Sequence, residues 1–327
     1  MTSGWIILDK PSGISSRAAG GRVARMFGVK KFGHLGTLDP MASGVLPIAL
    51  GEATKMVPYL ESSNNDKTAI GLCTLNFEHY EKEYLFRIKW GVRTDTDDIT
   101  GRVLEQNDSV PTDVQIQDAC RVLIGEVWQT PPAYSAVHIN GRRAYELARR
   151  GEQIEIPRRQ VKIYDLKYLD NKEFLVRCGT GTYVRSLAQQ IAEKCSKFKV
   201  QSSNNDKPSI ELCTLNFEHY ICTVDMIRRT FDNGFNIKDA HPLDFLENLY
   251  NNDPAEVQKY LCPVDFGLDD ILVLELDDND ARSFKNGGFI KSEINNSDIV
   301  RVYSDGIFVG VGTVTDGLLK PERVINT

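Results

Sequence analysis

The segment that decides the fold of this chain reads Gly33-His34-Leu35-Gly36-Thr37-Leu38-Asp39-Pro40-Met41-Ala42-Ser43-Gly44-Val45-Leu46-Pro47. It places one histidine and one acidic residue between glycines and prolines, and it runs directly into apolar residues. Glycine lets the backbone turn or approach a ligand closely, and proline stiffens it. An isolated Asp-Pro pair is most often a solvated turn. The extended pattern instead predicts a rigid loop that holds the Asp39 carboxylate at a fixed place.

Further short motifs lie on both sides of this loop in the chain. They are Leu-Asp-Lys-Pro-Ser-Gly-Ile-Ser-Ser at 8–16, Gly-Glu-Ala-Thr-Lys at 51–55, Lys-Glu-Tyr at 82–84, Gly-Thr-Gly-Thr-Tyr-Val-Arg-Ser at 179–186, Arg-Arg-Thr at 228–230 and Phe-Lys-Asn-Gly at 284–287. In this order the motifs resemble those of the TruB family of pseudouridine synthases. Each short motif is weak alone, whereas the aspartate loop combined with residues 179–186 is specific.

The resemblance implies an α+β fold with a mixed, largely antiparallel sheet and flanking helices. It implies a catalytic domain over residues 1–250, with a thumb-like RNA-clamping segment at about 127–160. A small PUA-like β-barrel is expected over residues 262–327, where short apolar runs alternate with glycine-rich turns at 271–276, 299–303 and 307–311.

Residue periodicity places two of the motifs on secondary structure. An alternating apolar face predicts a strand that carries Tyr84, Phe86, Ile88 and Trp90. Spacings of three and four predict an amphipathic helix with Val184, Leu187, Ile191 and Cys195 on one face. Arg185 is therefore expected at a strand-to-helix turn, where side chains project at the edge of a sheet.

By resemblance, Asp39 is the nucleophile and Arg185 is the arginine that pairs with it. A bidentate guanidinium would orient the carboxylate and favour its charged form. Tyr84 would stack on the target base and help to remove the proton from C5, although a tyrosine on an apolar strand face is more often part of the core. Whether the carboxylate attacks the base or the sugar stays open.

The resemblance also implies a set of substrate-binding residues. His34 would occupy space in an RNA loop from which the target base is flipped out, and Tyr183 and Ile227 would line the pocket. The family usually has leucine at the position of Ile227. Lys10 is either structural or an RNA contact. The thumb-like segment contributes Arg142 and Arg143.

The charge distribution is uneven. The net charge of −6 argues against a nucleic-acid ligand when it is taken alone. Residues 1–60, however, carry seven Lys and Arg against three Asp and Glu, and residues 136–160 carry six arginines against three glutamates. Residues 232–327 carry eighteen acids against eight bases. A local basic surface can bind phosphates while a distant acidic surface faces solvent.

The composition indicates neither a membrane protein nor a metalloprotein. No run reaches the roughly 18 apolar residues of a membrane span, so a cytoplasmic location is expected. The chain has seven cysteines without a Cys-x-x-Cys pair, which is typical of free thiols. The acidic run at 94–98 lacks the glycine and glutamate of a calcium loop and is interpreted as a turn. No metal and no cofactor are expected.

One segment occurs twice. Residues 62–80 recur at 202–220 with 16 of 19 positions identical. Each copy interrupts family-like sequence and begins with a cluster of turn-forming residues, so both are interpreted as in-frame surface insertions. A metal site that combines Cys73, His79, Cys213 and His219 is the less favoured alternative, because Cys-x5-His is not a usual ligand spacing.

Two functions follow from these observations. The favoured hypothesis is a bacterial-type tRNA pseudouridine-55 synthase that acts on the T-arm as a monomer, without a guide RNA. The alternative is an RNA-binding or RNA-folding factor whose catalytic centre the insertions have disabled. All the matching catalytic side chains are present, which favours the enzyme.

Overall fold

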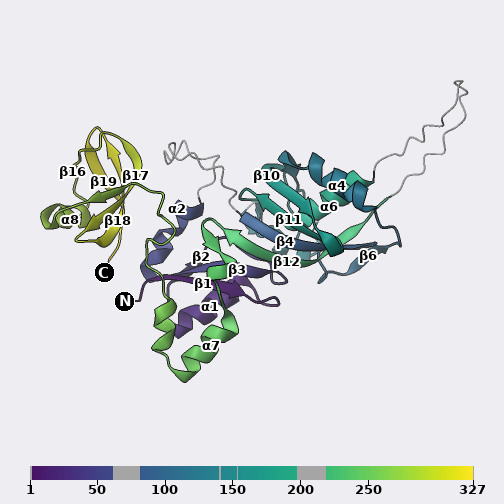
Figure 1. Ribbon diagram of the computed structural model, residues 1–327, viewed down its shortest axis with the longest axis horizontal. Coiled ribbons are helices and arrows are strands. Elements are labelled where there is room, and N and C mark those ends of the chain that lie inside the picture. The colour runs from purple at the N-terminus through teal and green to yellow at the C-terminus, as the bar shows by residue number, and fades with distance from the viewer. Residues whose placement is uncertain (1, 62–81, 140, 153, 197–218, 327) are drawn as a thin grey trace, which may run out of the picture. The chain divides into compact units, whose positions relative to one another are not determined.

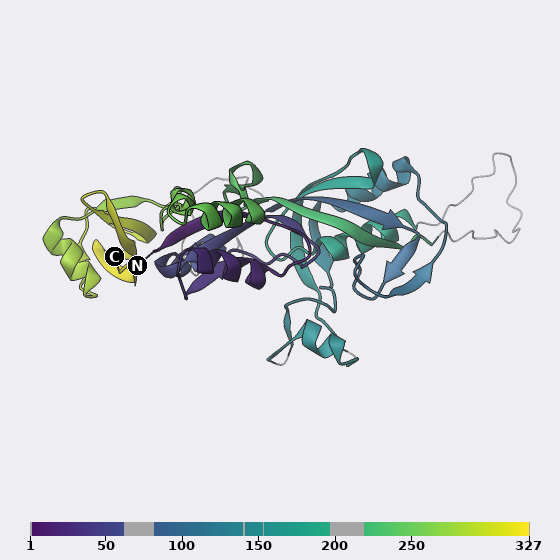
Figure 2. The same cartoon turned by 90° about the horizontal axis from the view of Figure 1, so that it is seen from below.

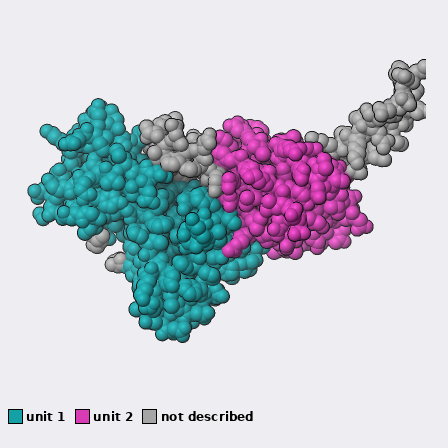
Figure 3. Space-filling model, in the orientation of Figure 1, with its two compact units in different colours: residues 1–81, 229–327 teal, residues 82–228 magenta. Residues whose placement is uncertain are grey.

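The computed structural model describes residues 2–61, 82–139, 141–152, 154–196 and 219–326. The chain forms two compact units (Figures 1 and 3): a first unit of residues 1–81 and 229–327, and a second unit of residues 82–228. Most of the repeated segment lies outside the described residues, and so do Cys73, His79 and Cys213. Within the described ranges, no helix is long and apolar enough to cross a membrane.

The first unit begins with strands of a ten-stranded sheet that flank the aspartate loop. Strand β1 (Gly4–Lys10) pairs antiparallel with β3 (Ser43–Leu50), and β2 (Phe32–His34) also pairs antiparallel with β3. Short β14 (His241–Pro242) pairs parallel with β1. The accompanying elements are α1 (Ser16–Met26), η1 (Gly51–Lys55), α2 (Val57–Glu61), β13 (Phe235–Asn236), η3 (Ile237–Asp239), α7 (Leu243–Asn252) and η4 (Glu256–Tyr260).

The C-terminal part of the first unit is a five-stranded sheet in the order β15-β17-β18-β19-β16, curled into a half-barrel (Figure 1). Its elements are β15 (Val273–Glu275), α8 (Asp278–Lys285), β16 (Ile290–Lys291), β17 (Ser297–Ser304), β18 (Ile307–Thr315) and β19 (Leu318–Val324). The three strands expected from the sequence here are confirmed, and the half-barrel is consistent with a PUA-like domain.

This C-terminal sheet shares a hydrophobic core with the N-terminal strands of the same unit. Trp5 on β1 is fully buried in one cluster with Val311 and Ile325. The indole of Trp5 also donates a hydrogen bond of 2.9 Å to the carbonyl of Val264. The expected boundary near residues 250–262 therefore falls within one packed unit, and the division into 1–250 and 262–327 stays a prediction.

The second unit contains an antiparallel sheet in the order β4-β11-β10-β7. These strands are β4 (Lys82–Trp90), β7 (Gly125–Gln129), β10 (Arg159–Tyr168) and β11 (Glu173–Cys178). Its other elements are β5 (Val92–Thr94), β6 (Val103–Gln106), α4 (Asp113–Val122), η2 (Asp170–Lys172) and α6 (Val184–Cys195). Strand β12 (Cys222–Asp232) carries the chain from the second unit to the first.

Both periodicity predictions in this unit are confirmed. The alternating side chains of β4 and the spaced apolar side chains of α6 are all buried. The thumb-like segment contains the short strands β8 (His138–Ile139) and β9 (Arg142–Arg143) and the helix α5 (Ala144–Arg149). Figure 2 shows this segment projecting from the rest of the second unit.

Candidate active site

Asp39 lies in a tight turn of the first unit. Its backbone carbonyl accepts a hydrogen bond of 3.0 Å from the amide of Ala42, with Pro40 at the second position of the turn. Proline favours this position because its φ is preset. The Asp39 side chain is half-buried, whereas its neighbours Leu38 and Met41 are buried. The Asp-Pro pair is thus a turn, and it holds a half-buried carboxylate between the buried side chains of Leu38 and Met41.

Lys10 stabilises this turn through hydrogen bonds to backbone carbonyls. The side chain is fully buried, and its ammonium donates to the carbonyls of Pro11 at 2.9 Å, Ile14 at 2.8 Å and Pro40 at 3.4 Å. These acceptors belong to the Lys-Pro loop and to the Asp39 turn. The contacts support the structural interpretation of Lys10.

Burial lowers the pKa of Lys10 to about 8, and the positive charge of Arg229 acts in the same direction, while the negative charge of Asp39 opposes them. A lysine that loses its proton more easily is the direct consequence of removing an ammonium group from water. The ammonium nevertheless retains three carbonyl acceptors, so its charged form is well solvated by the backbone.

Residues at the start of α1 attach that helix to the aspartate loop, defined here as residues 35–42. The buried hydroxyl of Ser16 donates to the carbonyl of Leu38 and accepts from its amide, both at 2.9 Å. The hydroxyl of Ser12 donates to the carbonyl of Met41 at 2.7 Å, and the amide of Gly13 donates to Pro40 at 2.7 Å. The loop is therefore held along most of its length by the segment that precedes α1.

A buried ion pair lies against the aspartate loop. Arg229 Nη1 lies 2.7 Å from Asp232 Oδ2, and neither side chain is exposed. The same guanidinium donates to the carbonyls of Val45 at 2.8 Å and Leu35 at 3.4 Å. Gly36 has a φ of +61°, and a Cβ at that position would come within 2.7 Å of Arg229 Nη1. Only glycine fits this close approach without a shift of the arginine.

His34 ends β2 at the entrance to the loop. Its Nδ1 lies 2.6 Å from the carbonyl of Gly36 and its ring is half-buried. Because a carbonyl only accepts, Nδ1 must carry the proton in this contact. The imidazole is thereby oriented by the loop that carries Asp39.

Arg185 lies in the second unit, at the start of α6. The residue is 2% exposed, and its guanidinium donates to the carbonyls of Thr96 and Tyr134, each at 2.9 Å. Its Nη1 also lies 3.8 Å from Asp98 Oδ2. The expected strand-to-helix turn is confirmed, with Gly181 at a φ of +90° between β11 and α6.

The acidic run at 94–98 forms a turn, as the sequence predicts, and the turn supports Arg185. The Oδ1 of buried Asp98 accepts from Thr96 Oγ1 at 2.9 Å and from the amide of Thr100 at 2.9 Å. Asp97 adopts a φ of +60°. Burial, with the nearby carboxylates Asp98 and Asp95, raises the pKa of Asp97 to about 6, although the Arg185 and Arg93 guanidiniums act against this rise.

Tyr183 is held by a glutamine and an arginine of the same unit. The buried side chain of Gln129 accepts from the amide of Tyr183 at 3.0 Å. The guanidinium of Arg159 lies over the Tyr183 ring, 4.8 Å from its centroid, and donates to the carbonyl of Gly181. The ring is half-buried, so one part of its surface faces solvent.

Tyr84 and Ile227 also lie in the second unit, on β4 and β12. Tyr84 pairs in register with Val176 and is 7% exposed, and Ile227 is 5% exposed. On the thumb-like segment Arg142 is exposed, whereas Arg143 is half-buried and donates to the carbonyl of Ala136 at 2.6 Å.

The predicted site residues thus divide between the two units. Lys10, His34 and Asp39 are brought together in the first unit by the contacts of the aspartate loop. The others lie in the second unit: Tyr84, Arg142, Arg143, Tyr183, Arg185 and Ile227.

Sequence reasoning missed the roles of Ser16, Asp98 and the Arg229–Asp232 pair. The motifs at 8–16, 94–98 and 228–230 contain Ser16, Asp98 and Arg229 but do not indicate what these residues contact, and Asp232 lies outside all three.

Comparison with known proteins identifies the family of this chain. The model of the TruB family pseudouridylate synthase N-terminal domain matches residues 24–79 and 70–184, and that of the pseudouridine synthase II TruB C-terminal domain matches residues 273–325. Proteins named tRNA pseudouridine synthase B are similar over nearly the whole chain. The one from Wolbachia pipientis is 34% identical and covers 100% of this chain and 99% of its own, and the one from Ehrlichia chaffeensis is 36% identical and covers 99% of each.

Solved structures show the same fold at low sequence identity. The crystal structure of a Cbf5-Nop10-Gar1 complex matches with a TM-score of 0.62 and 21% identity, over 98% of this chain and 84% of the matched chain. An H/ACA RNP bound to a substrate RNA containing 2'-deoxyuridine matches with a TM-score of 0.62 and 19% identity, over 99% and 85%. Both family models and full-length similarity above 30% identity lead to one conclusion: this chain belongs to the TruB family of pseudouridylate synthases.

Proposed function

We propose that this protein is a tRNA pseudouridine-55 synthase that isomerises a uridine in the T-loop of tRNA with Asp39 as the nucleophile. The observation that carries the proposal is the fixed turn that presents the half-buried Asp39 carboxylate, held by Lys10 and Ser16. The relatives named tRNA pseudouridine synthase B support tRNA as the substrate.

The reaction is an isomerisation that needs neither an oxidant nor a reductant. The bond between uracil N1 and the ribose C1′ breaks, the base turns, a new bond joins C5 to C1′, and the proton on C5 is transferred to N1. Asp39 assists by attack on the base or on the sugar, or by stabilising a developing cation. The turn favours the reaction by holding the carboxylate in place, because a group that is already fixed does not have to be ordered in the transition state.

The second unit supplies the remaining groups. Arg185, held by the carbonyls of Thr96 and Tyr134, keeps its planar fork in one orientation for the Asp39 carboxylate. Tyr84 stacks on the flipped base, and Tyr183 and Ile227 bound its pocket. His34 takes space in the vacated RNA loop. Arg142, which is exposed on the thumb-like segment, binds RNA phosphates together with Arg143, whose guanidinium donates to the carbonyl of Ala136.

The protein acts as a cytoplasmic monomer, without a cofactor, a metal or a guide RNA. The test is to incubate the purified chain with an unmodified T-arm hairpin and to map pseudouridine at the expected uridine. Formation of one pseudouridine per hairpin without any added RNA supports the proposal. Activity that requires a guide RNA, or binding without isomerisation, contradicts it, and the second result would favour the RNA-folding factor.

A further inference from the structure

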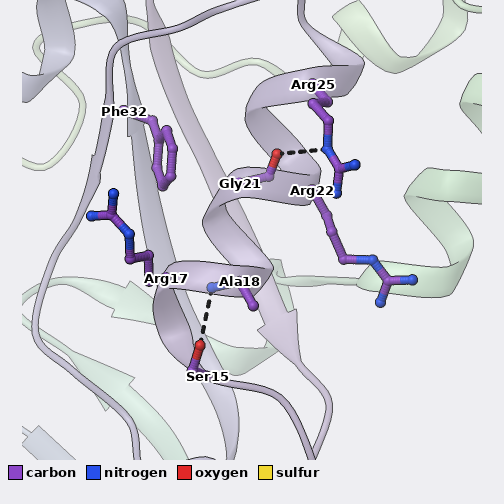
Figure 4. Close-up of a pocket in the computed structure, with 7 residues that line it drawn as sticks. All are labelled: Ser15, Arg17, Ala18, Gly21, Arg22, Arg25 and Phe32. Carbon is purple, nitrogen blue, oxygen red and sulfur yellow. Dashed lines mark hydrogen bonds between the residues drawn. The ribbon is translucent and has the colours of Figure 1, made fainter.

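Helix α1 carries a pocket that the catalytic residues do not use. Its volume is about 680 Å³, and it lies entirely within the first unit. Figure 4 shows its lining side chains, with Phe32 and Arg17 on one side of Gly21 in this view and Arg22 and Arg25 on the other. The lining is completed by Ser15 and Ala18.

Gly21 lines this pocket, and the adjacent Gly20 packs against Phe32. A Cβ at Gly20 would lie 3.0 Å from the Phe32 ring, so packing of the ring explains that glycine. A Cβ at Gly21 would lie 3.6 Å from the same ring, which is an ordinary contact. Alanine therefore fits at position 21 and would stabilise the helix by about 1 kcal/mol. Packing against the Phe32 ring therefore does not require the open space beside Gly21.

The charge around the hollow is positive and largely uncompensated. Arg17, Gly21 and Arg25 follow one another at four-residue steps, so the two arginines lie on the same face, about 12 Å apart along the axis. Arg22 pairs with Glu247 at 2.9 Å. Among the described residues, no carboxylate lies within ion-pair distance of Arg17 or Arg25. Arg25 Nε donates to the Gly21 carbonyl at 3.3 Å, which leaves its terminal nitrogens directed elsewhere.

We propose that this pocket binds phosphates of the RNA backbone outside the target loop, with the half-buried Phe32 ring contacting a ribose or a base. Guanidinium groups bind phosphate oxygens with two parallel hydrogen bonds, and an aromatic face accepts nucleotides of any sequence. The hydroxyl of Ser15 already accepts from the amide of Ala18 at 3.2 Å. The phosphates are therefore bound by the arginine side chains and not by the N-terminus of the helix.

The pocket is connected to the aspartate loop by adjacent residues. Arg17 follows Ser16, whose hydroxyl makes two hydrogen bonds with Leu38, next to Asp39. An RNA strand bound to α1 is thereby held in a fixed position relative to the Asp39 turn. This inference rests on the proposed function for the identity of the RNA, and it adds a binding subsite to that function.

The decisive comparison is Gly21→Glu against Gly21→Gln. Both side chains have a higher helix propensity than glycine and nearly the same shape, so both variants should fold, which a thermal melt verifies. Only glutamate places a negative charge between Arg17 and Arg25. The affinity for a T-arm hairpin is expected to fall about tenfold or more for Gly21→Glu and to stay within about threefold for Gly21→Gln.

Salt dependence provides the second readout. Arg17→Gln combined with Arg25→Gln should reduce the slope of log K against log salt by roughly 1.4 to 1.8, because two phosphate contacts are lost. An unchanged slope, or equal effects of Glu and Gln at position 21, would overturn the proposal.

A second hairpin, with the target uridine replaced by cytidine, separates this inference from the proposed function. If the parent isomerises the uridine hairpin but the variants bind both hairpins as the parent does, only the pocket proposal fails. If the parent isomerises nothing, the function fails, and the cytidine hairpin still tests the pocket by the same affinity and slope.

Discussion

Arg229 and Asp232 form an ion pair of 2.7 Å in which neither side chain has any exposed surface. The pair lies directly against Gly36, three residues before Asp39, and Arg229 also binds the carbonyls of Leu35 and Val45. One guanidinium on β12 thus binds Leu35 at the start of the aspartate loop and Val45 in β3, just after the loop. The position of the Asp39 carboxylate depends on a charge pair that is itself removed from water.

Arg229→Met should destabilise the protein by about 3–5 kcal/mol, because it leaves the Asp232 carboxylate buried without the guanidinium. The double variant Arg229→Met with Asp232→Leu should recover a large part of this loss, since an apolar pair of similar volume costs little to bury. Urea unfolding measures both. Equal stabilities of the single and double variants would show that the buried carboxylate is compensated by other groups.

Asp39→Asn should lower the single-turnover rate on T-arm RNA by on the order of 10⁴-fold or more, because the amide keeps the shape but lacks the charge and the nucleophilic oxygen. The Asp39 backbone turn to Ala42 does not use the side chain, so folding should be retained. RNA affinity should stay within a few-fold of the parent. Turnover close to normal would exclude Asp39 as the nucleophile.

Arg185→Lys should reduce turnover by on the order of 10²-fold or more, since a displaced catalytic geometry has effects of this size. A lysine cannot reproduce the planar fork that reaches the carbonyls of Thr96 and Tyr134 together. The matched control is Arg121→Lys, on the exposed pair with Asp118, for which no change is expected. A similar loss in both variants would point to a general effect on the fold.

The sequence predicted the elements that depend on local pattern. The β4 alternation and the α6 spacing follow from side-chain period alone, and both are buried as expected. The aspartate loop was recognisable because glycine and proline restrict the backbone at fixed positions.

Long-range partners could not be predicted in the same way. Nothing local indicates that Ser16 binds Leu38, 22 residues away, or that Arg229 binds Val45, 184 residues away. Such contacts are set by tertiary packing, which a single sequence does not encode as a spacing. The same reason applies to Lys10, because its burial and its hydrogen bond to the carbonyl of Pro40 in the Asp39 turn are not visible in its motif.

Asp97→Asn should increase stability at neutral pH. Burial raises the pKa of Asp97 to about 6 in the folded state, above its unfolded value, so the folded protein holds this proton more tightly. The contribution of Asp97 to the free energy of unfolding therefore falls as pH rises from about 4 to about 6. Asparagine tolerates the positive φ and stays neutral. Urea unfolding from pH 4 to pH 7 should show the advantage of the variant growing over this interval.

The control for this pH dependence is Asp108→Asn, because Asp108 is exposed. Its difference from the parent should be nearly constant with pH. An Asp97→Asn difference that is equally constant would mean that the carboxylate is well solvated by the groups around it.

Replacing residues 197–218 by a short Gly-Ser linker should preserve folding and activity. The described residues on either side already meet, because the amide of Tyr220 donates to the Ser196 hydroxyl at 2.9 Å. Closing a shorter connection costs less chain entropy, so the free energy of unfolding should be unchanged or higher by about 1 kcal/mol.

Deleting the complete repeat, residues 202–220, should instead be harmful, because its last residue is part of the second unit. Tyr220 is 6% exposed and its hydroxyl lies 3.4 Å from Gln115 Oε1. Loss of a buried aromatic ring costs about 3–5 kcal/mol. Thermal unfolding of the two deletion variants, together with pseudouridine formation on T-arm RNA, distinguishes them. Equal stabilities would show that Tyr220 adds nothing to the core, and unfolding of both would show that the second repeat has become an integral part of this unit.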